Sequence, residues 1–251
     1  MDRERQILAC SGVIYPPGGS PPELVGAQVR QAMVLARARR AKVCLIATAT
    51  GDSQAQLDRW YESSEWFGAA DLSHLALFTQ PNVPDVRAHL LAQDVIFVSG
   101  GSVVNLLAVW RAHRLDVIIR ECWAAGVVLA GGSAGSLCWH QSGVTDSFGD
   151  SLDPVTDGLG FLPFSNGVHD DLADQPRRRR YRELVAAGGL PAGYATEDGV
   201  ALHYVGTELR EAVTVVPGRR AWHVAPDGAG GYRETAIPAR YWLPPRSTSP
   251  G

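Results

Sequence analysis

Residues 127–139 read Val127-Val128-Leu129-Ala130-Gly131-Gly132-Ser133-Ala134-Gly135-Ser136-Leu137-Cys138-Trp139. The stretch begins as an apolar run with β-branched residues, which favours a buried strand, and continues as small residues that can open a helix. Gly131 to Gly135 fits the G-x-S-x-G pattern of a nucleophile elbow, a sharp turn between a strand and a helix that exposes a serine hydroxyl. Ser133 is therefore the candidate nucleophile.

Glycines on both sides of Ser133 allow the chain to turn sharply and keep side chains away from an incoming carbonyl group. A serine hydroxyl is a weak nucleophile, so it also requires a nearby base and the positive end of a helix. The same five-residue pattern arises by chance in many sequences. The alternative interpretation is a glycine-rich turn that binds an anion or only packs.

Apolar runs alternate with helical patterns before this elbow. Strands are expected at 6–13, 42–48, 75–79 and 94–98 and at the elbow, and helices at 22–40, 54–67, 83–91, 105–113 and 115–125. This alternation predicts an α/β fold, a three-layer doubly wound arrangement around a mostly parallel sheet. In such sheets the ligand binds outside the carboxyl ends of the strands. Two of these ends, at Gly100-Gly101 and Gly131-Gly132, are rich in glycine, so we expect the ligand site there.

The second half of the chain has a different composition. Residues 146–167 are rich in Gly, Pro, Asp and Ser, which favours loops and short strands above the cleft. Later strands are expected at 200–205, 211–216 and 221–224. We predict a single α/β domain over residues 1–240. A loosely held tail over 241–251 is expected because Pro, Arg and Ser dominate the end of the chain.

Composition excludes several classes of protein. The chain has 251 residues, of which 45% are apolar, and a formal net charge of −3. This length can bury a full core, whereas the small charge favours neither nucleic acid nor membrane as a partner. No run approaches the ~20 apolar residues of a membrane span, and the charged N-terminus does not resemble a signal peptide.

The four cysteines, Cys10, Cys44, Cys122 and Cys138, lie far apart in the sequence. They are interpreted as buried thiols in a reducing compartment and not as a disulfide framework. Zinc-site spacings such as C-x-x-C or H-E-x-x-H are absent. We expect a soluble cytoplasmic protein with no metal and no other cofactor. The oligomeric state is left open, with a homodimer as one option.

Attack by Ser133 on a carbonyl requires a base and two N–H donors for the oxyanion. The amide of Ala134 and an amide of the glycine loop, that of Gly101, are the expected donors; alternatively the loop is a plain turn. Of seven histidines, His169 is the candidate base because it follows a loop-rich segment and is flanked by carboxylates. The other six are expected to be core or surface residues: His74, His89, His113, His140, His203 and His223.

The carboxylate that would orient the base is left open by the residues alone. Four aspartates lie between Ser133 and His169, namely Asp146, Asp150, Asp153 and Asp157. A surface loop carries acidic residues for solvation in any case, so each of them has this simpler explanation.

Several motifs occur together in a fixed order. Val98-Ser99-Gly100-Gly101 is followed by the elbow, and Gly158-Leu159-Gly160-Phe161-Leu162-Pro163 then leads to His169. In order and spacing the chain resembles the serine peptidases that comprise peptidase E, the aspartyl dipeptidase, and cyanophycinase. The segments 47–52, 106–110 and 193–198 match as well, so that the resemblance covers roughly residues 7–225.

The resemblance implies a Ser-His-carboxylate hydrolase on a sheet like that of class I glutamine amidotransferases. By position Ser133 would be the nucleophile, His169 the base, and the amides of Gly101 and Ala134 the oxyanion hole. Asp146 is nearest the offset expected for the acid, Asp150 is the second choice and Glu197 the third. Arg177 matches an arginine that holds the acidic side chain of the substrate, although a solvated basic helix start explains it equally well.

The implied function is cleavage of an amide bond in a small peptide or dipeptide through an acyl-enzyme on Ser133. Alternatives are a cyanophycinase-like isopeptidase, an esterase, or a catalytically silent relative that binds a small ligand. Two departures from the family pattern motivate the last of these: Ser102 replaces a usual Asn, and Val168 replaces the usual Pro or Gln before the histidine. A true α/β-hydrolase is disfavoured because its histidine usually lies much further from the serine.

Overall fold

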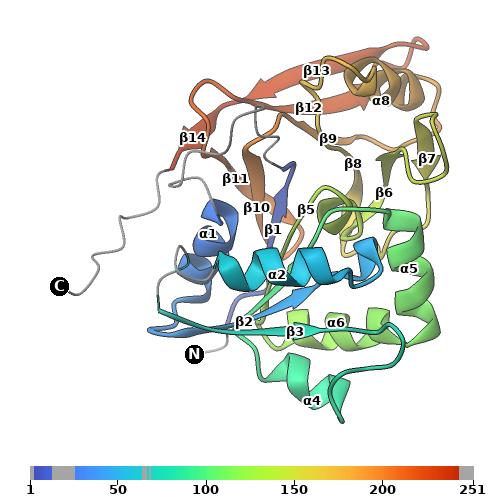
Figure 1. Ribbon diagram of the computed structural model, residues 1–251. Helices are drawn as coiled ribbons and strands as arrows, with labels where there is room; N and C mark the ends of the chain where they lie inside the picture. The colour runs from blue at the N-terminus through green and yellow to red at the C-terminus, as the bar shows by residue number, and fades with distance from the viewer. Residues whose placement is uncertain (1–2, 13–25, 64–66, 68, 243–251) are drawn as a thin grey trace.

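A computed structural model describes residues 3–12, 26–63, 67 and 69–242. Its larger sheet has eight strands in the order β14-β11-β10-β1-β5-β4-β2-β3 (Figure 1). Five adjacent strands run parallel to one another, namely β1, β5, β4, β2 and β3. Strand β10 is antiparallel to β1. Their bounds are β1 Gln6–Cys10, β2 Ala41–Ile46, β3 Ala70–Leu75, β4 Val95–Val98, β5 Val128–Gly132, β10 Val200–Val205, β11 Glu208–Thr214 and β14 Ala239–Tyr241.

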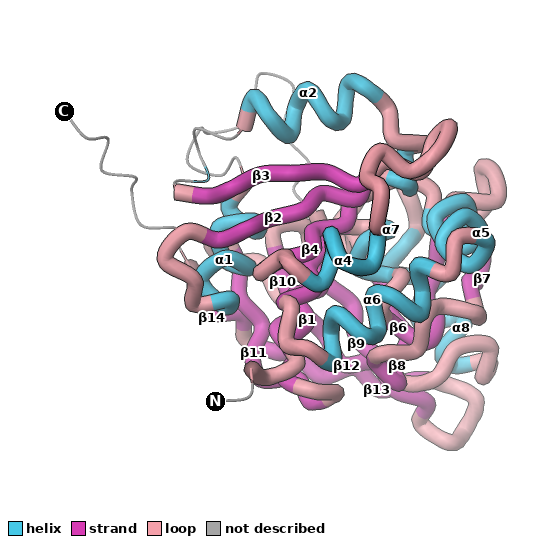
Figure 2. Tube along the Cα trace, turned by 90° about the horizontal axis from the view of Figure 1, so that it is seen from below, coloured by secondary structure: helices cyan, strands magenta, loops and turns pink. Residues whose placement is uncertain are grey.

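Helices cover both faces of this sheet. Along β1, Ile7 and Ala9 join one apolar cluster whereas Leu8 and Cys10 join another, as the alternation of side chains along a strand requires. One cluster includes α4 (Val86–Leu91), α5 (Val103–Ala112) and α6 (Leu115–Ala124), and the other α1 (Ala27–Ala36) and α2 (Gln54–Glu62). Figure 2 shows α2 on one side of β2 and β3 and α4 and α6 on the other. The predicted α/β fold with a mostly parallel sheet is confirmed.

The second half of the chain forms a sheet of its own. Its six strands lie in the order β13-β12-β9-β8-β6-β7, and only β6, β8 and β9 are parallel. Their bounds are β6 His140–Thr145, β7 Asp153–Val155, β8 Leu162–Gly167, β9 Gly193–Thr196, β12 Ala221–Pro226 and β13 Tyr232–Ile237. Helix α8 (Arg177–Ala186) packs Tyr181 and Val185 against this sheet (Figure 1). The prediction of one sheet is therefore wrong for this half.

Two boundaries differ from the prediction for physical reasons. Strand β3 lies at Ala70–Leu75, earlier than 75–79, because it is an edge strand whose polar residues do not form an apolar run. The expected tail begins at residue 241, but Tyr241 still pairs with β11 as the last residue of β14, and the amide of Trp242 donates to the Thr214 carbonyl oxygen over 2.8 Å. Residues 243–251 lie outside the described part of the chain.

The four cysteines are buried and free, as expected of thiols in apolar surroundings. Among the residues that the structure describes, no helix has the length and apolar character needed to cross a bilayer.

Candidate active site

The elbow forms where β5 ends at Gly132. Ser133 has φ 55° and ψ −112°, and the short helix α7 (Ala134–Leu137) follows it directly. A non-glycine residue at positive φ costs of order 1–3 kcal/mol, so the surrounding structure must hold it in place. The Ser133 amide donates to the carbonyl oxygens of Cys10 and Ser11, each over 3.0 Å, and thereby fixes the turn to the end of β1.

The glycines of the elbow are required by close packing. A Cβ at Gly135 would overlap the carbonyl group of Val98 at the end of β4, and one at Gly131 would lie 2.5 Å from the carbonyl oxygen of Gly135. At Gly132, by contrast, a Cβ would meet no atom within 4 Å. The two outer glycines therefore let α7 approach β4.

Replacing Gly135 by Ala is expected to lower the free energy of unfolding by about 3 kcal/mol, because a backbone carbonyl cannot move aside for the new methyl group. Gly132→Ala is the matched control and should change the same quantity by less than about 0.5 kcal/mol. Urea denaturation of both variants measures the difference. Equal stabilities would contradict the packing described for Gly135.

Three side chains form a hydrogen-bonded row at this turn. The Ser133 hydroxyl lies 2.9 Å from Nε2 of His169, and Nδ1 of the same ring lies 2.6 Å from Oδ1 of Asp198. The side chains of His169 and Asp198 are only 14% and 10% exposed. The carboxylate therefore acts on the imidazole with little screening by water. With Nδ1 protonated towards Asp198, Nε2 is free to accept the proton of the serine hydroxyl.

The backbone of His169 is fixed by hydrogen bonds, and this positions the imidazole ring. His169 has φ 58°, and its amide donates to the Ser11 hydroxyl over 2.7 Å. That hydroxyl in turn donates to the Thr196 carbonyl oxygen over 2.9 Å. Gly12 lies against the ring, because a Cβ there would be 3.0 Å from Cε1 of His169. The end of β1 thus positions both the serine and the histidine.

The backbone of Asp198 is also held by a hydrogen bond. Asp198 lies just after β9, and its backbone amide donates to Oδ1 of Asp171 over 2.7 Å. The other oxygen of Asp171 pairs with Arg219. The backbone of Asp198 is therefore anchored to the residue two positions beyond His169, which keeps the acid and the base in register.

The prediction that Asp146 lies against His169 is wrong. The carboxylate of Asp146 pairs with Arg177, whose Nη2 lies 2.6 Å from Oδ2. The second choice, Asp150, lines a separate hollow with Arg179 and Arg180. The third, Glu197, accepts the amide of Arg220 over 2.9 Å.

Arg177 is likewise not where the resemblance puts it. It is 6% exposed and bonds Asp146 and Gln175, and it does not line the pocket beside Ser133. The carboxylate that Arg177 binds belongs to the protein, so the predicted contact with an acidic substrate side chain is corrected.

The Asp146–Arg177 pair makes a contribution to stability that depends on pH. Partial burial works to raise the pKa of Asp146, but the charge and hydrogen bond of Arg177 lower it overall. A lowered pKa in the folded state stabilises the protein above the unfolded pKa, and this stability is lost as the pH falls through the folded value. Asp146→Asn should therefore lower the free energy of unfolding at pH 7 by about 1 kcal/mol, since water screens a carboxylate that is 43% exposed.

Denaturation of this variant and of the unmodified chain at pH 7 and pH 3 measures the effect. The difference in unfolding free energy should be smaller at pH 3, because the stabilisation by the charged carboxylate is lost as the pH falls towards its folded pKa. A difference that stays constant would contradict the charge pairing.

The loop that follows β4 faces the serine. A Cβ at Gly100 would lie 3.2 Å from the Ser133 Cβ, so this loop passes close to the serine. Gly101 has φ 136°, and a Cβ there would overlap the Ala49 carbonyl. Ala49 belongs to the short 3₁₀ helix η2 (Thr48–Thr50) and accepts the Ser102 amide over 2.9 Å.

The two residues that depart from the family pattern, Ser102 and Val168, have structural roles. Ser102 caps α5, because its hydroxyl accepts the Asn105 amide over 3.2 Å. Val168 is 1% exposed and belongs to the main apolar cluster. Neither residue contacts the row of Ser133, His169 and Asp198 through a hydrogen bond of its side chain.

Burial shifts the pKa values of two other titratable groups, Cys10 and His140. Cys10 lines the pocket beside Ser133, but burial raises the pKa of its thiol to about 12. His140 is fully buried, and this burial lowers its pKa to about 4. Burial therefore disfavours a thiolate at Cys10. No group of three or more potential metal ligands occurs within the described ranges.

Known proteins resemble this chain over much of its length. The model of peptidase family S51 matches residues 26–212 of the chain. The chain belongs to this family. Its sequence is 40% identical over 185 residues to the peptidase YgaJ of Bacillus subtilis strain 168, which covers 73% of the chain and 77% of the relative. It is 31% identical over 150 residues to peptidase E of Shewanella denitrificans, with 57% of the chain and 63% of the relative covered.

Solved structures support the fold of this S51 member. A peptidase from an acI-B1 actinobacterium superposes with a TM-score of 0.65 at 16% identity, covering 95% of this chain and 96% of the other. A candidate peptidase E from Listeria monocytogenes EGD-e gives a TM-score of 0.58 at 16% identity, covering 85% and 100%. The resemblance to the peptidase E family is therefore confirmed.

Sequence reasoning missed Asp198. The first two choices, Asp146 and Asp150, lie between the serine and the histidine, and the third, Glu197, is the neighbour of the carboxylate that meets the ring, which follows the histidine by 29 residues. One signal was available, because Asp198 ends the motif Gly193-Tyr194-Ala195-Thr196-Glu197-Asp198 at the end of a strand. An acid at a strand end is well placed to enter a site built at strand ends.

Proposed function

We propose that this family S51 member is a serine peptidase that cleaves an amide bond of a small peptide through an acyl-enzyme on Ser133. The observation that carries the proposal is the row from Ser133 through His169 to Asp198, with separations of 2.9 and 2.6 Å. Both distances are within the range of catalytic hydrogen bonds. Asp146, the acid expected from the sequence, has no part in it.

In the first step the Ser133 oxygen attacks the substrate carbonyl carbon while Nε2 of His169 takes the hydroxyl proton. The amides of Gly101 and Ala134 donate to the resulting oxyanion. The carbon–nitrogen bond then breaks, and the imidazolium gives its proton to the leaving amine. Asp198 holds the ring in the required tautomer and stabilises its positive charge.

In the second step water attacks the acyl-enzyme and gives a proton to Nε2 of His169. The carbon–oxygen bond to Ser133 breaks, the serine regains its proton from the imidazolium, and the free acid leaves. No cofactor is needed for this sequence, because every proton passes through His169.

The family membership favours peptide bonds over esters or isopeptide bonds, and a substrate panel tests this. The purified chain is incubated with dipeptides, β-linked isopeptides and alkyl esters, and the released amines or alcohols are quantified. The proposal predicts release from α-linked peptides that disappears in His169→Ala. Release from isopeptides or esters alone, or no release from any substrate, would contradict it.

A further inference from the structure

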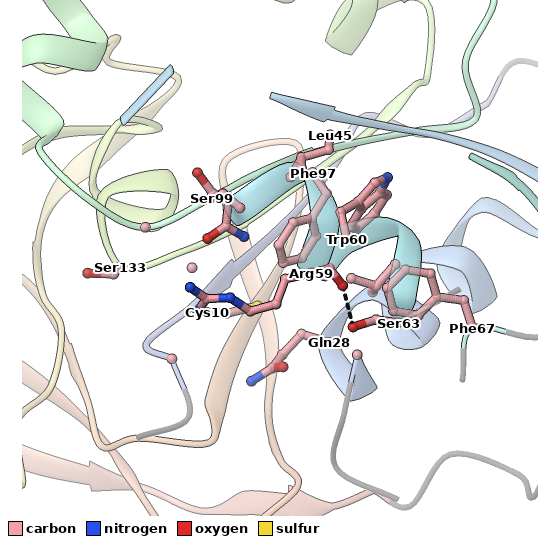
Figure 3. A pocket seen from close by; sticks show the side chains of 16 residues that line it. Cys10, Gln28, Leu45, Arg59, Trp60, Ser63, Phe67, Phe97, Ser99 and Ser133 are labelled. Carbon is pink, nitrogen blue, oxygen red and sulfur yellow. Dashed lines mark hydrogen bonds between the residues drawn. The ribbon is translucent and has the colours of Figure 1, made fainter. Parts of the chain in front are cut away.

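A pocket of about 570 Å³ lies directly beside Ser133 (Figure 3). Ser99, Gly100 and Gly132 line the end nearest the hydroxyl, and α1 and α2 supply much of the remaining wall. This volume is typical of a small-molecule site and exceeds the space that a single small polar side chain fills. A bound group must therefore reach well beyond the reacting carbonyl.

The far wall of the pocket is aromatic. Trp60 of α2 lies with its ring centroid 4.9 Å from that of Phe67 and 6.3 Å from that of Phe97. Leu45 and Val29 extend this apolar surface. An aspartate side chain packed on these rings would place its charge against an apolar surface, which is unfavourable. A large apolar side chain, by contrast, gains about 25 cal/mol for each square ångström removed from water.

Among the described residues that line the pocket, Arg59 on α2 is the charged one. Figure 3 shows its guanidinium extending across the pocket towards the end that holds Ser133. Within the described part of the chain Arg59 has no ion-pair partner, unlike Arg177. A guanidinium free of a protein carboxylate can bind one on a ligand through paired N–H donors.

The reactive end of the pocket carries a second unused polar group. The Ser99 residue is 5% exposed, lines the pocket, and its buried hydroxyl has no hydrogen-bond partner among the described residues. Buried polar groups are normally satisfied, so an unsatisfied one beside a pocket indicates a ligand contact. This observation is independent of Arg59 and lies at the same end as Ser133.

We propose that this pocket selects acidic peptides with a large aromatic residue at the cleaved bond: the aromatic side chain packs on Trp60, Phe67 and Phe97, and Arg59 binds a carboxylate of the same substrate. This inference rests on the proposed function, because it assigns the acyl side of the bond to the pocket beside Ser133. It replaces the aspartate-binding role predicted for Arg177, whose guanidinium is engaged by Asp146.

Three chromogenic anilides separate the two parts of the proposal. Succinyl-Phe-p-nitroanilide has both the ring and a carboxylate, acetyl-Phe-p-nitroanilide lacks the carboxylate, and succinyl-Ala-p-nitroanilide lacks the ring. We expect kcat/KM for the first to exceed that for the second about 10-fold, through one charge-assisted contact. It should exceed that for the third about 10- to 100-fold, through burial of the ring.

Arg59→Gln should reduce the succinyl-to-acetyl ratio from about 10 to about 1, mainly through KM. Arg39→Gln removes an exposed arginine that does not line the pocket, and is the matched control that should keep the ratio. A ratio near 1 in the unmodified chain, a ratio unchanged by Arg59→Gln, or faster cleavage of an aspartyl anilide than of the phenylalanyl ones would overturn the inference.

A binding measurement separates this inference from the proposed function. Calorimetric titration of Ser133→Ala with N-succinyl-phenylalanine requires no turnover, and Kd should rise about 10-fold when Arg59→Gln is added. Binding that weakens about 10-fold with Arg59→Gln, without any hydrolysis by the unmodified chain, would contradict the peptidase proposal and support the assignment of the pocket. Hydrolysis of peptides with a Kd that Arg59→Gln leaves unchanged would support the peptidase proposal and contradict the assignment of the pocket.

Discussion

Replacing Asp198 by Asn is expected to lower kcat about 10⁴-fold with little loss of stability. The amide can still accept a hydrogen bond, or donate one to Nδ1 of His169, and in the second case the ring adopts the wrong tautomer for accepting the serine proton. The side chain of Asp198 is 10% exposed, so water cannot replace the lost charge efficiently. Steady-state turnover of a peptide substrate measures the effect, and thermal unfolding checks the fold.

Asp146→Asn is the matched control for this prediction. The same chemical change is made at the acid that the sequence favoured, which pairs with Arg177 and not with the imidazole. Its kcat should stay within about 3-fold of the unmodified value despite the loss of stability described above. The reverse pattern, with Asp146→Asn inactive and Asp198→Asn active, would refute the assignment of Asp198.

Ser133→Ala is expected to lower kcat about 10⁶-fold, because the acyl-enzyme can no longer form. His169→Ala should cost nearly as much, since the hydroxyl then lacks the group that lies 2.9 Å away to take its proton. Both changes remove the same proton transfer from Ser133 to His169. The kcat of the double variant should therefore lie within about 10-fold of the kcat of either single variant. Single-turnover measurements with a chromogenic anilide are sensitive enough for this comparison.

Additive losses in the double variant would contradict the shared proton transfer. So would substantial turnover by Ser133→Ala, which would assign the nucleophile to another group. Cys10 also lines the pocket, but burial raises its thiol pKa to about 12.

The parts of the fold that could be predicted from sequence are those built from continuous apolar runs. Strands β2 and β4 are buried on both faces, so their residues are apolar at nearly every position. The elbow could be predicted for a related reason. Only glycine permits the approach of Gly135 to Val98, and that requirement leaves a visible pattern around Ser133.

The second sheet could not be predicted in this way. Strand β8 combines buried polar residues such as Ser165 and Asn166 with glycine, and its hydrogen bonds to Tyr181 and Ser136 come from distant parts of the chain. Such strands are defined by their partners and not by a local apolar pattern.

The parts of the site that could be predicted from sequence are those that depend on a local motif. The turn at Ser133 and the position of His169 follow from local motifs, whereas the choice of the acid depends on how β9 lies beside β8. Asp146 and Asp198 are both aspartates near glycine-rich segments, and only the strand pairing brings one of them to the ring. The same holds for Arg177, whose partner is a residue 31 positions earlier.

Covalent labelling with a fluorophosphonate tests the central claim most directly, because the reagent reacts with a serine only where a base activates the hydroxyl. After digestion, mass spectrometry should place the adduct on Ser133, and labelling should be abolished in His169→Ala and strongly slowed in Asp198→Asn. Asp146→Asn should be labelled at the normal rate. An adduct on a different residue, or labelling of Ser133 that persists without His169, would contradict the account.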